Sequence, residues 1–199
     1  MSNRTTLARV SSLVLCCLLV PSVASAHPEA GGVGGLVSGF LHPLTGLDHV
    51  VAMVAVGLWG AYLGAPAMWL LPVIFPMVMA FGGALGILGV PLPGTEVGIA
   101  LSGVLLGLAV ACAARPPLWV AGTLVGVFAI FHGHAHGTEL PHAANALTYA
   151  VGFVVATGLL HLGGIAFGLL TRYRWGGVVV RAGGGVIAGI GFAFLFGIF

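Results

Sequence analysis

Long apolar segments follow one another along almost the whole chain, separated by short stretches rich in proline and glycine. Each segment approaches the roughly 20 apolar residues that a helix needs to cross a bilayer. Only 5% of the residues are charged, and a soluble domain of 199 residues could not bury so much apolar surface. The sequence therefore predicts an all-α integral membrane protein, a six-transmembrane-helix bundle. The expected spans are residues 40–63, 68–89, 96–114, 117–136, 143–170 and 178–198.

The first 26 residues have the pattern of a secretory signal peptide. Two arginines precede a short apolar run at Leu13–Val20, and small residues ending at Ala26 match a cleavage site. An uncleaved first transmembrane helix is the alternative, but the run is too short to span a bilayer comfortably. We therefore predict a signal peptide at 1–26 and one six-helix transmembrane domain at 27–199.

The arginines predict how the bundle is oriented in the membrane. A cleaved signal peptide leaves the mature N-terminus in the periplasm, and six crossings return the C-terminus to the same side. The loops after the first, third and fifth spans then face the cytoplasm, and these loops carry the arginines of the mature chain, as the positive-inside rule requires. Arg115 lies in the third loop, Arg172 and Arg174 lie in the fifth, and Arg181 lies just beyond the fifth. The sparse charge excludes a nucleic-acid surface, so the partners expected are a lipid bilayer and an ion.

Three of the eight histidines lie within nine residues, Phe131–Glu139. Each residue of a helix turns about 100°, so His132 and His136 share one face while His134 points the opposite way. Two imidazoles four residues apart are a common helical site for a divalent metal. The alternative is a polar helix end that happens to be rich in histidine. Gly137 and Pro141 predict that the helix ends near His136, with Glu139 folding back instead of continuing the stripe of His132 and His136.

A second polar group occurs at the start of the first span. His42 and His49 would lie about 10.5 Å apart along a straight helix, too far to share one ion. Pro43 and Gly46 both disrupt regular helix, which allows an irregular segment that lines a cavity. A carboxylate within the bilayer, as predicted for Asp48, is costly unless it faces a cavity or a partner. The alternative for Asp48 is a hydrogen bond to a neighbour that only holds the structure together.

Most other ionisable residues are expected in the outer half of the bundle. Glu96 opens the third span. His27, as first residue of the mature chain, would offer its α-amine and imidazole as a weak chelate; the alternative is an incidental tail residue. His161 lies further in, as an exit-side ligand or a helix-contact histidine. The candidate metal ligands are His27, His42, Asp48, His49, Glu96, His132, His134, His136 and Glu139.

Imidazoles with a few carboxylates and no usable thiolate favour divalent ions such as Ni²⁺, Co²⁺ or Zn²⁺. A permease needs ligands weak or numerous enough to release the ion, and a staggered set fits such a path. We therefore expect the ion as cargo, with no permanently bound cofactor and no catalytic residue. A membrane-embedded metal-dependent hydrolase, which needs a closed site with an activated water, is the first alternative. A metal-storing or sensing subunit is the second.

Small residues four apart let membrane helices approach closely. Gly103 with Gly107, and Gly185 with Gly189, have this spacing. The pattern predicts tight helix packing, either within the chain or in a homo-oligomer.

Two motifs resemble those of one family of membrane proteins. The stretch His-Pro-Leu-Thr-Gly-Leu-Asp-His at 42–49, with Ala52-Met53 and Val56-Gly57 after it, resembles the first-span motif of the HupE/UreJ family of nickel permeases. Phe131–Glu139 resembles that family's other motif, and the resemblance covers essentially the whole chain. It implies uptake of nickel, or cobalt, across the bacterial inner membrane to supply hydrogenase or urease. Asp48-His49 also resembles the helix motif of the broader nickel/cobalt transporter group, with one residue more between His42 and Asp48.

Overall fold

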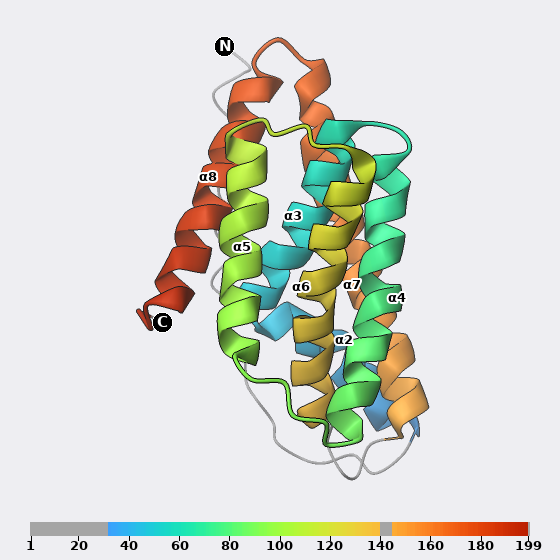
Figure 1. Cartoon of the computed structure of the whole chain (residues 1–199). Helices are drawn as coiled ribbons and strands as arrows, with labels where there is room; N and C mark the ends of the chain where they lie inside the picture. Colours follow the sequence, from blue (N-terminus) through green and yellow to red (C-terminus); the bar gives the residue numbers. More distant parts are fainter. Residues whose placement is uncertain (1–31, 140–144, 199) are drawn as a thin grey trace, which may run out of the picture.

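The computed structural model describes residues 32–139 and 145–198 (Figure 1), and the elements in this part of the chain are helical throughout. The predicted signal peptide and His27 lie outside the described residues. The elements are α2 (Gly32–Thr45), α3 (Leu47–Leu63), α4 (Ala67–Ile87), α5 (Thr95–Ala111), α6 (Leu118–Thr138), α7 (Ala146–Gly168), the 3-10 turn η1 (Leu169–Arg172) and α8 (Gly176–Leu195).

The helices have the length and composition of membrane spans. The segments α4, α6, α7 with η1, and α8 are each long and apolar enough to cross a bilayer. The pair α2 and α3 meets the same test when taken together, and α5 is apolar but shorter, at 17 residues. These lengths confirm a helical membrane protein, and the sixth span stays a prediction that depends on α5.

The predicted first span at 40–63 needs correction. Helix begins earlier, at Gly32, and the chain bends by 82° between α2 and α3. The bend falls at Gly46, whose backbone is extended (φ −89°, ψ 110°) and which caps the start of α3. Pro43 lies in the last turn of α2, where its missing N–H weakens the ladder of helix hydrogen bonds. Of the two residues that the sequence predicts to disturb the helix, Pro43 therefore lies just before the break and Gly46 lies at it.

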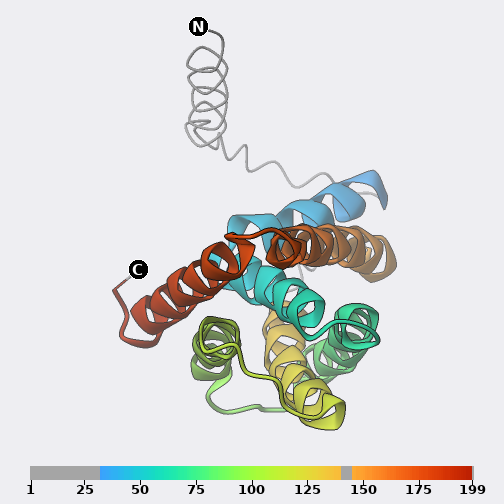
Figure 2. The same ribbon diagram turned by 90° about the horizontal axis from the view of Figure 1, so that it is seen from above.

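Helix α3 lies inside the bundle, with α7 on one side and α4 and α5 on the other (Figure 2). Glycines bring the neighbouring backbones into contact. In α7, a Cβ at Gly164 would meet the backbone of Val54 and Leu58 in α3. In α6, a Cβ at Gly133 would meet the backbone of Met79 in α4. These contacts hold the histidine-bearing segments of α3 and α6 in fixed positions.

Adjacent glycines in α7 provide a matched test of this packing. Gly164→Ala should lower the free energy of unfolding by about 1–3 kcal/mol, because the added methyl has to push α3 away. A Cβ added at Gly163 would have no atom of the described residues within 4 Å, so Gly163→Ala should stabilise the helix by about 0.5–1 kcal/mol. Thermal unfolding of both purified variants in one detergent measures the difference. Equal stabilities would show that α7 does not pack on α3 in this way.

The two glycine pairs have different surroundings. Gly103 and Gly107 in α5 face Gly191, Ala188 and Gly184 of α8, so this pair is used within the chain. Gly185 and Gly189 have no atom within 4 Å of an added Cβ among the described residues. A homo-oligomer through the face of Gly185 and Gly189 remains a prediction.

Candidate metal-ion site

The bend at Gly46 brings the two histidine motifs together. The ring centre of His136 lies 4.8 Å from that of His42 and 4.4 Å from that of His49. The ring of His49 in turn lies 4.9 Å from that of His132. Four imidazoles therefore form a continuous row in the order His42, His136, His49, His132, which we call the histidine row. His42 and His49 reach the same ring because the helix between them is broken.

Glu139 closes one end of the histidine row. Helix α6 runs to Thr138, two residues beyond the predicted end at His136, and Glu139 caps it. The carboxylate Oε2 of Glu139 lies 3.3 Å from Nε2 of His42. One ligand atom from each of His42, His136 and Glu139 lies within 4.8 Å of the others. The predicted fold-back after His136 is therefore wrong, because α6 continues to Thr138 and carries Glu139 on to His42.

The two ends of the row differ in exposure, and the two central residues, His136 and His49, are both largely buried. The side chain of Glu139 is 54% exposed and that of His42 is 30% exposed, whereas that of His49 is 12% exposed and His132 is fully buried. The row is therefore open at Glu139 and closed at His132. An ion entering at Glu139 would pass from water to a site surrounded by protein.

Asp48 fixes the orientation of His49. Its Oδ1 accepts the backbone N–H of His49 at 2.9 Å and lies 2.8 Å from the ring Nδ1. Because an ionised carboxylate only accepts, Nδ1 carries the hydrogen and Nε2 keeps its lone pair. A carboxylate in the first turn of α3 is also favoured by the helix dipole. Asp48 is thus placed behind a ligand, as carboxylates often are at metal-binding histidines.

Ser102 of α5 does the same for His132. The Ser102 hydroxyl donates to the carbonyl of Ile99 at 2.6 Å and lies 2.9 Å from Nε2 of His132. Since its one hydrogen is already donated, Ser102 accepts from Nε2–H of His132. Nδ1 of His132 therefore keeps its lone pair.

Several nitrogens of the row are buried without a hydrogen-bond partner among the described residues. They are Nε2 of His49, Nδ1 of His132 and both ring nitrogens of His136. An unpaired buried polar group costs about 1–3 kcal/mol, so four in one row are a substantial cost. A cation bound between the rings would satisfy the lone pairs. The donor set, imidazole nitrogen with carboxylate nearby, suits Ni²⁺, Co²⁺ or Zn²⁺.

Two predicted ligands lie away from the row. His134 points to the other side of α6, as its position on the helix indicated, and its Nε2 donates to the carbonyl of Val90 at 2.8 Å. Its Nδ1 lies 3.4 Å from the hydroxyl of Thr95. Glu96 is exposed in the first turn of α5, and its carboxylate has no ion pair or hydrogen bond with any other described residue. His134 therefore ties α6 to the α4–α5 connection.

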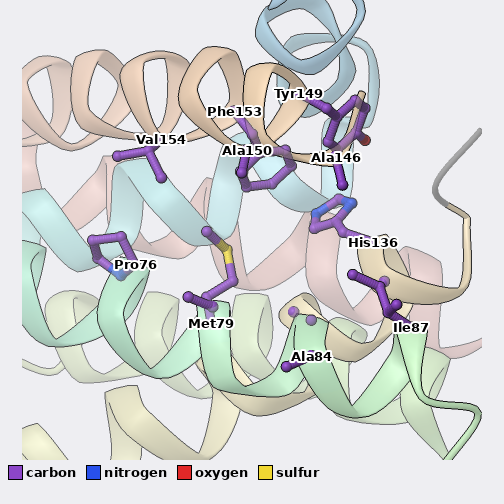
Figure 3. A pocket seen from close by; sticks show the side chains of 14 residues that line it. Pro76, Met79, Ala84, Ile87, His136, Ala146, Tyr149, Ala150, Phe153 and Val154 are labelled. Atoms are coloured by element: carbon purple, nitrogen blue, oxygen red, sulfur yellow. The ribbon is translucent and has the colours of Figure 1, made fainter. Parts of the chain in front are cut away.

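Aromatic residues that sequence reasoning missed form the walls of the row. The ring of Phe153 lies 4.3 Å from that of His136, and Tyr149 lies 5.9 Å from His42. Figure 3 shows His136 pointing into a cavity of about 220 Å³ that α4, α6 and α7 line with mostly apolar side chains. Ser102 was also missed, although a hydroxyl in an apolar span was a signal that could have identified it.

Comparison with known proteins decides the family. The model of the family described as "HupE / UreJ protein" matches residues 15–194. The chain belongs to the HupE/UreJ family. It is 48% identical to "Protein HupE" of Rhizobium leguminosarum bv. viciae over 183 residues, which cover 92% of this chain and 95% of that protein. No solved structure matches the chain.

Membership in the HupE/UreJ family agrees with both motif resemblances. The motifs at 42–49 and 131–139 lie within the matched residues and meet in the histidine row. The family and its HupE relative thus support a general role in nickel or cobalt uptake by a membrane protein.

Proposed function

We propose that this HupE/UreJ protein imports Ni²⁺, or Co²⁺, across the bacterial inner membrane to supply a hydrogenase or urease. The observation that carries the proposal is the histidine row. Four of its buried ring nitrogens have no hydrogen-bond partner within residues 32–139 and 145–198. The ion enters at Glu139 and His42, where the carboxylate attracts it, and passes to His136, His49 and His132. Asp48 and Ser102 hold two of these rings with their lone pairs free. The sequence carries no ATP-binding motif, so transport is secondary or facilitated.

The positions of the arginines support a periplasmic location for the open end of the histidine row. Arg115 lies over the ring of Tyr62, 4.7 Å from its centre, near the end of α3 opposite His49. Nε of Arg181 donates to the carbonyl of Ala111 at the end of α5, at 2.8 Å. The positive-inside rule assigns this end to the cytoplasm. The open end of the histidine row then faces the periplasm.

The extended row favours a permease over a hydrolase. A metal-dependent hydrolase holds one ion in a closed site together with a water and an acid/base group. Here the imidazoles are spread in sequence from an exposed end to a buried one, which suits stepwise movement of an ion. A storage or sensing protein would need a site that retains its ion. A row of ligands that runs from an exposed end to a buried one is better suited to passing the ion on.

Uptake of radiolabelled nickel into metal-starved cells tests the proposal. Cells that produce the protein should accumulate nickel well above cells without it, and excess Co²⁺ should compete while excess Mg²⁺ should not, because imidazole ligands do not suit Mg²⁺. Accumulation equal in both cell lines, with the protein present in the membrane, would contradict the proposed function.

A further inference from the structure

A second pair of polar side chains is buried without partners deeper in α7. His161 is 1% exposed and Thr157 is fully buried. Neither Nε2 of His161 nor Oγ1 of Thr157 has a hydrogen-bond partner in the part of the chain that the structure describes. The two residues are four apart, so they lie on one face of the helix about one turn from each other. An apolar span with two such groups loses stability unless something binds them.

This pair lies next to the closed end of the histidine row. The ring of Phe75 in α4 lies 5.5 Å from the ring of His132 and equally 5.5 Å from that of His161. Phe75 is fully buried and contacts both imidazole rings. The polar groups therefore continue inward past one aromatic ring. His161 lies seven residues before Gly168, the last residue of α7, and is therefore about 10 Å from that end of the helix along its axis.

One backbone carbonyl of α4 lacks its regular helix hydrogen bond. Pro76 has no N–H, so the carbonyl of Pro72 does not receive its regular helix hydrogen bond. Pro72 and His161 line the same cavity between α4 and α7. Free carbonyls within a membrane protein are tolerated where they line a cavity. The imidazole nitrogen of His161 and the hydroxyl of Thr157 make a mixed nitrogen and oxygen donor pair, and Pro72 is the α4 residue with the free carbonyl that lines the cavity beside His161.

We propose that His161 and Thr157 form an inner binding position for the divalent transition-metal ion, between the histidine row and the cytoplasm. This inference rests on the proposed function. The inner position has one imidazole where the row has four, so it binds the ion more weakly and favours release. Phe75 separates the two positions, and the ion moves between them when this ring or its helix shifts.

Transport kinetics test the inner position. His161→Leu and Thr157→Val keep apolar bulk and remove the donor atoms. In membrane vesicles, His161→Leu should lower the maximal rate of Ni²⁺ uptake by about tenfold, at the low end of the 10–100-fold range for changes around a metal site. Thr157→Val should lower the maximal rate less. The Ni²⁺ concentration for half-maximal uptake should stay unchanged in both, because the histidine row still captures the ion. Unchanged maximal rates in both variants would overturn the proposal.

A thiolate placed at the inner position gives a spectroscopic test. In a background with Cys16, Cys17 and Cys112 changed to Ala, His161→Cys should give purified protein a thiolate-to-cobalt charge-transfer band on addition of Co²⁺ alone, because a cysteine thiolate is a ligand for such ions. Leu160→Cys, one residue away on another face, should give none. If His161→Cys does not fold, Thr157→Cys is measured in the same way.

The outcomes separate the two proposals. Co²⁺ binding at the histidine row without a charge-transfer band from either cysteine would overturn the inner position and leave the proposed function intact. Failure of the cysteine-free parent protein to bind Co²⁺, together with no nickel uptake by wild type, would overturn both.

Discussion

We expect His136→Ala to reduce nickel uptake to near background, whereas His134→Ala, two residues earlier on α6, should leave most of the uptake intact. His136 is the central ring of the histidine row, in contact with both His42 and His49. Its two buried nitrogens have no partner among the described residues. Loss of even an outer-shell partner of a metal costs about 10–100-fold in affinity or activity, and loss of a central ligand should cost more.

His134 is the matched control because it has the same chemistry and lies on the same helix. Its hydrogen bond to the carbonyl of Val90 is worth about 1 kcal/mol, so His134→Ala should lower thermal stability slightly. Uptake is compared at equal amounts of protein in the membrane. A greater loss from His134→Ala than from His136→Ala would place the ion on the other face of α6.

Asp48→Asn should weaken uptake by about 10–100-fold in apparent affinity for nickel. The amide oxygen still accepts from His49, so the ring keeps its orientation. What disappears is the negative charge that offsets a divalent ion beside His49. The concentration dependence of uptake measures the change, and membrane insertion should not differ from wild type.

Asp48→Glu is the complementary variant because it restores the charge on a longer side chain. We expect it to recover part of the uptake that Asp48→Asn loses. Wild-type uptake by Asp48→Asn would show that Asp48 only orients His49 and contributes no charge to the site. An Asp48→Glu variant as impaired as Asp48→Asn would indicate that position, and not charge, is what the site requires.

Helical periodicity predicted part of the site correctly. The spacing on α6 placed His132 and His136 on one face and His134 on the other, and the structure has this arrangement. Pro43 and Gly46 predicted an irregular segment, and the structure has a bend of 82° at this place. The bend brings His42 and His49 to the same ring, that of His136. These features are local, so residues close in sequence were enough to predict them.

Helical periodicity does not predict which helices, far apart in sequence, contact one another. In a membrane bundle nearly every face of a helix is apolar, so hydrophobicity does not show which face meets which neighbour. Ser102 behind His132, and Phe75 between His132 and His161, depend on how α4, α5 and α7 pack around α3 and α6. The sequence predicts Glu96 as a metal ligand because it lies at the same end of the bundle as the histidines. In the structure its side chain is not part of the histidine row. The signal peptide and His27 stay predictions.

X-ray absorption at the nickel edge, on purified protein with equimolar Ni²⁺, tests most directly whether the histidine row binds the ion. The account predicts a nitrogen and oxygen shell with the multiple scattering of several imidazoles, no sulfur, and clear loss of the imidazole signal in His136→Ala but not in His134→Ala. A spectrum of hydrated nickel, or one unchanged by His136→Ala, would contradict it.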